Sequence, residues 1–141
     1  MNTTNISPYL FFAGRCEAAL DFYRTALGAQ TGMVMRYNES PDPVPPGMLQ
    51  EGFENKIMHA EFRVGETMIM ASDGRDDTTK FAGFRLALSV ETEAEAQRFF
   101  NALAEGGQVE MPLTKTFWSP SFGMVMDRFN VGWMVMVRTA E

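Results

Sequence analysis

The chain is poor in cysteine and histidine, with one of each among 141 residues. Without a second cysteine it has no partner for an intramolecular disulfide and cannot assemble a cysteine-based metal cluster. With one histidine it cannot build a three-histidine metal site either. Nothing in the sequence makes a nucleophilic triad, and Cys16, on the apolar face of a predicted helix, is expected in the core.

Basic residues and long apolar runs are scarce as well. Lys and Arg number 12 against 18 Asp and Glu, a formal net charge of -6. Such a balance argues against nucleic acid and against an anionic membrane surface, because both need a basic face. No apolar run approaches the roughly 20 residues that span a bilayer. The N-terminal stretch lacks a basic segment followed by an apolar one, so it does not read as a signal peptide and we expect a cytoplasmic protein.

Strand and helix patterns are present in two similar sets. In the first half we expect a helix at 15–27, ended by Gly28, and strands at 6–12, 31–37, 57–64 and 67–72. In the second half Thr92 and Glu95 form a capping box for a helix with its apolar face over 96–103. Strands are expected there at 84–90, 108–111, 123–128 and 133–138, with a loop between the second and third. The segment 38–56 contains four prolines and is predicted to be irregular, acting as a lid or as an ordered surface loop.

The two halves align at an offset of 76 positions, which places Leu10 on Leu86 and Tyr23 on Phe99. We therefore predict an α+β fold in which two tandem βαβββ modules occupy 1–141 as a single domain. The first module covers about 6–73 and the second about 84–138, joined by a polar linker at 74–83. Two unrelated α+β halves are the alternative.

The segment SPYLFFAGRCEAALDFYRTALGA resembles the first strand and helix of the glyoxalase, bleomycin-resistance and extradiol-dioxygenase modules, the vicinal oxygen chelate superfamily. KIMHAEFRVG, MIMASDGR and FNALAEGGQVEMPLTKTFWSPSFGMVMDRFNVGWMVMV resemble its PhnB-like subgroup, often labelled demethylubiquinone methyltransferase-like. The resemblance implies curled mixed sheets around a cleft, usually with a divalent metal, and a homodimer. A methyltransferase is rejected, because the sequence has no glycine-rich strand–turn–helix for a nucleotide cofactor.

In catalytic relatives the metal is held by His, Gln and Glu from the first and last strands of each module. Carried over to this chain, those positions fall near Pro8, Met70, Phe84 and Met134. None of these side chains is a ligand for an ion that prefers oxygen or nitrogen. We therefore predict that the usual metal site is lost and name no metal ligand or cofactor.

Methionine is abundant, with 12 residues. Four pairs are spaced two apart and so share one face of a strand: Met33 and Met35, Met68 and Met70, Met124 and Met126, Met134 and Met136. These faces either line an apolar, deformable pocket or pack against the helices as core. Core packing is the commoner position for a strand methionine.

His59 and Glu61 share one face of the strand 57–64. One interpretation makes them a catalytic acid/base pair, since histidine titrates near neutrality and a carboxylate can fix its tautomer. The other, which the pattern favours, is a polar face that meets water or hydrogen-bonds across the sheet.

Four further residues are candidate ligand contacts. Asp73 follows a strand and suits either a turn or a binding site. Trp118 and Phe122 belong to an aromatic loop that would stack on a planar ligand, cap the core or enter a dimer interface. Arg36 leads into the proline-rich loop. Asn130 is not one of these candidates. It lies in a turn where relatives carry glycine, and it is expected to be structural, in the left-handed conformation.

The function predicted first is binding of a small, partly apolar molecule in the cleft, with no metal and with Met70 and Met134 among its contacts. A metal-dependent isomerase, lyase or dioxygenase with a site relocated to His59, Glu61 or Asp73 is the alternative. A structural or regulatory partner domain is the third possibility.

Overall fold

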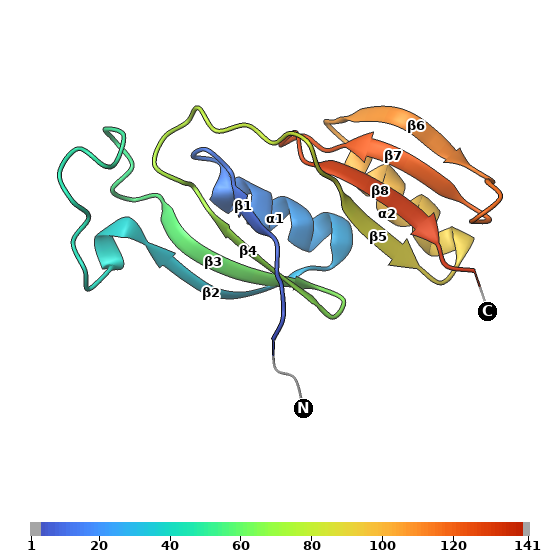
Figure 1. Cartoon of the computed structure of the whole chain (residues 1–141), viewed down its shortest axis with the longest axis horizontal. Coiled ribbons are helices and arrows are strands. Elements are labelled where there is room, and N and C mark those ends of the chain that lie inside the picture. Colours follow the sequence, from blue (N-terminus) through green and yellow to red (C-terminus); the bar gives the residue numbers. More distant parts are fainter. Residues whose placement is uncertain (1–3, 140–141) are drawn as a thin grey trace. The chain divides into compact units, whose positions relative to one another are not determined.

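A computed structural model describes residues 4–139. The chain divides into two compact units, the first ending at Lys80 and the second beginning at Phe81. This boundary lies inside the stretch 74–83 that was predicted as a linker. Each unit has its own sheet and helix (Figure 1). No helix within residues 4–139 has both the length and the apolar character to cross a membrane.

The first unit contains one four-stranded mixed sheet and one α-helix. Its elements are β1 (Tyr9–Phe11), α1 (Cys16–Leu27), β2 (Gln30–Arg36), the 3-10 turn η1 (Tyr37–Glu39), β3 (Ile57–Val64) and β4 (Thr67–Ser72). The strand order is β1-β4-β3-β2, with β1 parallel to β4 and the other pairs antiparallel.

The second unit repeats this topology. Its elements are β5 (Leu86–Val90), α2 (Glu93–Ala104), β6 (Gln108–Thr114), β7 (Phe122–Met126) and β8 (Gly132–Val137). The order is β5-β8-β7-β6, and β5 and β8 form the parallel pair. Two units of identical strand order confirm the predicted α+β fold of paired βαβββ modules.

Helix α1 packs its apolar face on the first sheet. The Tyr23 ring stacks on Phe62 of β3 with 5.6 Å between ring centroids, and both side chains are buried. Leu10 and Ile69 are buried on neighbouring strands. The helix ends at Gly28, which has a φ of 68° and caps two carbonyls of the last turn. Only a residue that tolerates the left-handed region ends a helix in this way without strain, so the predicted glycine stop is confirmed.

Helix α2 packs closely on the second sheet. The Thr92 hydroxyl accepts a hydrogen bond from the Glu95 backbone N–H, as a capping threonine should. A Cβ at Gly123 of β7 would lie 2.8 Å from the Phe100 ring, so the close approach of helix and strand requires glycine.

The repeat is real, but the helices align one residue later than predicted. Strands β1 and β5 follow the offset of 76, with Leu10 and Leu86 on the helix-facing sides. The buried residues of the helices match at 77 instead, in the pairs Ala19 with Ala96, Tyr23 with Phe100 and Ala26 with Leu103. The alignment of Tyr23 with Phe99 was therefore wrong, because it ignored the extra residue in the second strand–helix turn.

Several predicted boundaries also change. Strand β1 is three residues long, shorter than the predicted 6–12. Strand β6 continues to Thr114 where a loop was predicted from residue 111. It includes Pro112, which is tolerated because β6 is an outer strand that need not donate on its free side. The segment 38–56 contains the end of η1 and otherwise no helix or strand.

The turn between β7 and β8 is organised by the buried carboxylate of Asp127. Its Oδ1 accepts hydrogen bonds from the backbone N–H groups of Phe129 and Val131, and its Oδ2 accepts one from the Trp133 indole at 2.9 Å. Asn130 adopts a φ of 67°, which confirms its predicted left-handed conformation.

Candidate functional site

Each sheet has one face covered by its own helix and one that is not, and we call the second the open face. In the first unit Phe62 marks the helix side, because it stacks on Tyr23. The alternate residues of β3 therefore lie on the open face. The strand register places Tyr9, Met70 and Glu61 there side by side on β1, β4 and β3.

A chain of three polar side chains crosses this open face. The Tyr9 hydroxyl lies 3.0 Å from Nδ1 of His59, and Nε2 of His59 lies 3.1 Å from a carboxylate oxygen of Glu61. The His59 and Glu61 side chains are 24% and 34% exposed, so both are partly shielded from water. His59 and Glu61 thus hydrogen-bond each other, and the sheet adds a third member that sequence reasoning did not propose.

The hydrogen-bond partners of His59 favour one placement of the protons. An ionised carboxylate only accepts, so Glu61 selects the His59 tautomer that carries its proton on Nε2. Nδ1 is then an acceptor. The Tyr9 hydroxyl also lies 3.5 Å from the Met58 carbonyl oxygen, and it donates to Nδ1 over the shorter distance of 3.0 Å. Burial raises the pKa of the Tyr9 hydroxyl above its ordinary value, while a hydrogen bond with Ser72 offsets part of that rise. Tyr9 is accordingly a neutral donor at physiological pH.

Asp73 has a structural position. It is 1% exposed, and its two oxygens accept hydrogen bonds from the backbone N–H groups of Cys16 and Ile57, both at 2.7 Å. It therefore ties the start of α1 to the start of β3. The prediction that Asp73 contacts a ligand disagrees with this geometry, because no carboxylate surface is left for a ligand. Burial, and then the Asp73 charge, raise the pKa of the Cys16 thiol, which keeps it protonated and inert.

Arg36 faces helix α1 rather than the open face. Its guanidinium forms an ion pair with Glu17 at 3.1 Å and donates to the Asn55 carbonyl at 2.9 Å. These contacts hold the start of the proline-rich segment against the helix. Its contact with a ligand, predicted from the sequence, stays a prediction.

The open face of the second sheet consists largely of methionine. Val125, Trp133 and Val135 are buried, and the alternate residues of β7 and β8 point away from α2. Those residues include Met124, Met126, Met134 and Met136, joined by Met111 of β6, which pairs with Met124. All five are half-buried. The interpretation that strand methionines pack against the helix is therefore wrong here, because the smaller β-branched residues and Trp133 occupy that side.

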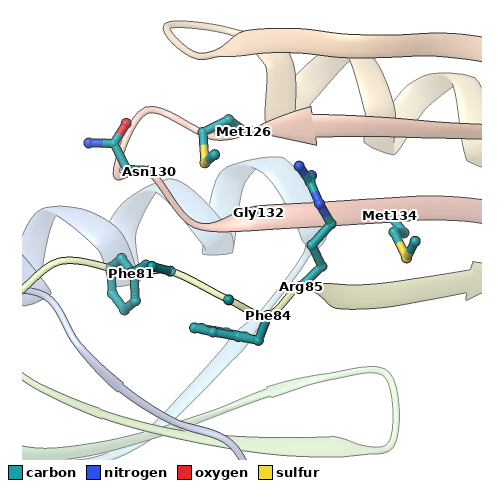
Figure 2. Close-up of a pocket in the computed structure, with 9 residues that line it drawn as sticks. Phe81, Phe84, Arg85, Met126, Asn130, Gly132 and Met134 are labelled. Carbon is teal, nitrogen blue, oxygen red and sulfur yellow. The ribbon is translucent and has the colours of Figure 1, made fainter.

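A surface pocket of about 520 Å³ opens on this face (Figure 2). It is lined by Phe81, Ala82, Gly83, Phe84, Arg85, Met126, Asn130, Gly132 and Met134. The Arg85 side chain crosses Gly132, where a Cβ would lie 3.2 Å from Arg85 Cγ, and its guanidinium forms an ion pair with Glu110. Glycine at 132 thus makes room for the arginine, and Glu110 neutralises the charge. The pocket is left with aromatic and thioether walls.

The aromatic loop before β7 lies partly over the same face. Phe122 is 5% exposed and pairs with Met136, and the Trp118 ring meets it edge-on at 5.2 Å between centroids. Trp118 is half-exposed, and Phe117 is 97% exposed. Phe122 therefore caps the sheet, while Trp118 and Phe117 present ring surface to the outside. No ligand contact of Trp118 or Phe122 is established by this arrangement.

The positions that hold a metal in the superfamily do not fit a hard divalent ion. Across the first parallel strand pair, Met70 pairs with Tyr9, one residue after the predicted position near Pro8. Across the second pair, Met134 pairs with Ala87. The cationic Arg85 lies two residues before Ala87. Thioethers and a methyl group are poor ligands for such an ion, and a guanidinium repels it. The Tyr9 hydroxyl keeps its proton because burial raises its pKa, so it is a poor ligand as well. Among residues 4–139 no three His, Cys, Asp or Glu side chains gather closely enough to hold a metal.

The predicted site residues therefore separate into three groups. His59, Glu61 and Met70 meet on the open face of the first sheet, and Met134, Trp118 and Phe122 belong to that of the second. Asp73 and Arg36 contact helix α1 or its first residue. The residues that sequence reasoning missed are chiefly Tyr9, Phe81, Phe84, Arg85 and Met126. The alternation of Tyr9 with buried Leu10 was the available signal, since it places the tyrosine opposite the core.

The sequence matches the family described as 3-demethylubiquinone-9 3-methyltransferase over residues 4–136. It is 36% identical over 140 residues to protein YjdN of Escherichia coli strain K12, covering 94% of each chain.

Solved structures agree with this match. Protein PA1353 from Pseudomonas aeruginosa superposes with a TM-score of 0.85 at 41% identity, covering 98% of this chain and all (100%) of that one. The PhnB protein from Bacillus cereus superposes with a TM-score of 0.78 at 27% identity, covering 95% and 99%. The fosfomycin resistance protein FosX from Listeria monocytogenes, at 12% identity and a TM-score of 0.67, covers 99% and 96% and shares the fold alone.

Proposed function

Since this chain belongs to the PhnB-like family described as 3-demethylubiquinone-9 3-methyltransferase, with the fold of the glyoxalase and FosX superfamily, we propose that it binds a small, partly apolar molecule without the divalent metal usual in that superfamily. The observation that carries the proposal is the pocket of about 520 Å³ on the open face of the second sheet. Pockets of this size and apolar lining are typical of small-molecule sites.

The lining favours a flat, largely uncharged ligand. Phe81 and Phe84 meet edge-on at 6.3 Å between centroids, and Phe84 is half-exposed. Met126 and Met134 add flexible, polarisable thioethers that adapt to different shapes. Because Glu110 already neutralises Arg85, a strongly anionic ligand would have to displace that carboxylate. Aromatic rings and thioethers without a spare charge support an aromatic ligand with few charges.

Methyl transfer is not part of this proposal, although the family description names it. The described residues form two mixed four-stranded sheets, each with one parallel strand pair. Nucleotide cofactors are commonly bound by a parallel sheet with a glycine-rich turn before a helix. Calorimetric titration with S-adenosylmethionine should give no binding heat, and saturable binding would contradict this point.

The binding experiment is a thermal-unfolding screen with aromatic small molecules, followed by NMR of methyl-labelled methionines. Binding at about 100 times the dissociation constant adds roughly 2.7 kcal/mol to the free energy of unfolding. The Met126 and Met134 methyl signals should move, whereas that of Met48, which is exposed in the first unit, should not. Met134→Lys should weaken binding at least tenfold, and Met48→Lys is the matched control. Equal affinity in both variants would reject this pocket as the site.

The metal-free part of the proposal has its own test. Chelator-treated protein is titrated with zinc, nickel, manganese, iron(II) and magnesium while thermal unfolding is followed. We expect no saturable shift of the melting temperature. A shift with one metal that His59→Ala removes would instead support the relocated metal site that the sequence left open.

A homodimer is part of the same proposal and rests on the superfamily resemblance. Light scattering on the purified protein measures it directly. A monomer at all concentrations would remove the homodimer and leave the pocket, which is formed by residues of one chain, unaffected.

A further inference from the structure

The three hydrogen-bonded side chains on the open face of the first sheet, Tyr9, His59 and Glu61, do not line the binding pocket described above. Tyr9, His59 and Glu61 come from β1 and β3, and the first two are 50 positions apart in the sequence. Strand β4 lies between β1 and β3 in the sheet, so the side chains meet above it. Such a meeting depends on the fold and not on local turn geometry.

We propose that Tyr9, His59 and Glu61 form a metal-free proton relay, with Tyr9 as the catalytic acid and base toward a carbonyl or hydroxyl compound. His59 is the positioning residue that takes up the Tyr9 proton, and Glu61 stabilises the imidazolium that results. The hydrogen bonds of 3.0 Å and 3.1 Å give the order of the relay.

The direction of each hydrogen bond supports this order. Glu61 accepts from Nε2, so Nδ1 of the neutral ring is left to accept the Tyr9 proton. A carboxylate behind an imidazole holds its tautomer and stabilises its charged form, the arrangement that activates hydroxyl groups in hydrolases. The difference here is that the hydroxyl belongs to a tyrosine, whose ordinary pKa of about 10 makes it a stronger acid than the aliphatic hydroxyl of a serine.

The neighbourhood of Tyr9 suits a small organic substrate. The Tyr9 side chain is partly exposed, and its ring lies 5.0 Å from that of Phe11 and 5.6 Å from that of His59. Met70 is its direct neighbour on β4. The reacting oxygen therefore stands beside apolar groups on one side and the relay on the other. Partial exclusion of water strengthens the hydrogen bonds that would orient a substrate.

The proton transfer balances within these residues. A substrate proton moves to the Tyr9 oxygen as the Tyr9 hydroxyl proton moves to Nδ1 of His59, and the electron pair of the broken bond stays on the substrate. His59 becomes an imidazolium, and its Nε2 proton remains directed at Glu61. Reversal of the same two transfers returns a proton to the substrate, at the same or a neighbouring atom. Tyr9 never accumulates as a phenolate, which agrees with the raised pKa of its hydroxyl.

A generic carbon acid tests the relay without knowledge of the natural substrate. Nitrobenzisoxazole loses one ring-carbon proton to a base, its N–O bond breaks, and the cyanonitrophenolate product absorbs visible light. General base catalysis contributes roughly 10²–10⁴-fold to a rate. We expect the wild-type protein to accelerate the reaction saturably and Tyr9→Phe to lower kcat by about 10²-fold with little change in KM.

The matched control is Tyr37→Phe, the same chemical change in the same unit. The Tyr37 hydroxyl donates to the Gly74 carbonyl at 2.8 Å and is not hydrogen-bonded to His59. This variant should retain the wild-type kcat. Equal rates for wild type and Tyr9→Phe, or no acceleration by the wild type, would overturn the proposal.

A second readout does not depend on turnover. Because His59 is the single histidine of the chain, each imidazole nitrogen gives one NMR signal. The neutral ring should show the proton on Nε2, and Glu61→Leu should shift the population toward the other tautomer. A wild-type ring with its proton on Nδ1 would overturn the relay, since Nδ1 could not then accept from Tyr9. This measurement also decides the case if Tyr9→Phe fails to fold.

Discussion

The two open faces carry different chemistry on the same strand topology. On the first sheet the central residues are Tyr9, His59 and Glu61. On the second sheet the corresponding surface consists of methionines with Phe122 at its end. The helix-facing sides, in contrast, keep similar residues at matched positions, such as Ala19 with Ala96 and Tyr23 with Phe100.

This contrast has a physical reason. A side chain between helix and sheet must fill a defined volume, because protein interiors are close-packed. An open-face side chain meets no helix of its own unit and tolerates changes of size and polarity. The helix sides therefore stabilise each unit, while the open faces are free to specialise. In this protein one face carries polar hydrogen bonding and the other an apolar, adaptable surface.

The largest loss of stability is expected from removing a buried carboxylate that holds the framework of the first unit together and lies on neither open face. Asp73→Ala leaves the buried N–H groups of Cys16 and Ile57 without their acceptor. We expect a loss of about 3–5 kcal/mol in the free energy of unfolding, measured by urea denaturation. The exposed Asp42→Ala should stay within about 0.5 kcal/mol. A loss below about 1 kcal/mol for Asp73→Ala would contradict its structural role.

Two neighbouring residues of β8 test the two sides of the second sheet. Val135 is 0% exposed and faces α2, so Val135→Ala should cost about 2–3 kcal/mol from lost burial and the cavity left behind. Met134→Ala removes more atoms, but from the open face, and should cost about 1 kcal/mol or less. Chemical denaturation of both variants gives the ranking. The reverse ranking would mean that the methionine face carries the stability of this unit.

The first unit should be the alkaline-sensitive one. Burial raises the pKa values of Cys16, Tyr9 and Tyr37, all in this unit. Above the ordinary pKa of each group the unfolded chain releases a proton that the folded chain keeps, so stability falls as pH rises from about 8.5. The proton retained by Cys16, the most buried of the three groups, costs roughly 1.4 kcal/mol per pH unit, and the more exposed tyrosines add less. Denaturation between neutral and alkaline pH measures the slope, and Cys16→Ala should flatten it. An identical slope in that variant would contradict the assignment to Cys16.

The smallest effect is expected at the aromatic loop. Phe117 is 97% exposed, so Phe117→Ser should change the free energy of unfolding by less than about 0.5 kcal/mol. Phe122→Ser, at a ring that is 5% exposed, should cost several times more. Thermal unfolding of the pair distinguishes the outward-facing ring from the one that covers the methionine face. Equal losses would show that Phe117 also packs in solution.

The order of elements could be predicted because its signals are local. The helix stop at Gly28, the cap at Thr92 and the hairpin at 57–72 each depend on residues a few positions apart, and the structure agrees with them. The extension of β6 through Pro112 could not be predicted, because a proline is acceptable there only on an outer strand. Strand order is a long-range property that no local pattern contains.

The features of the candidate site also divide into those set by local sequence and those set by long-range packing. The sequence by itself determined that His59 and Glu61 share a face and that the methionine pairs share faces, because strand alternation is local. Only the tertiary structure decided which face each helix covers and that Tyr9 meets His59 across β4. Alternation defines two faces of a strand but does not say which one a helix will bury. That choice depends on the packing of distant segments. It placed the methionines of β7 and β8 on the open face, and it made Asp73 a buried link between α1 and β3.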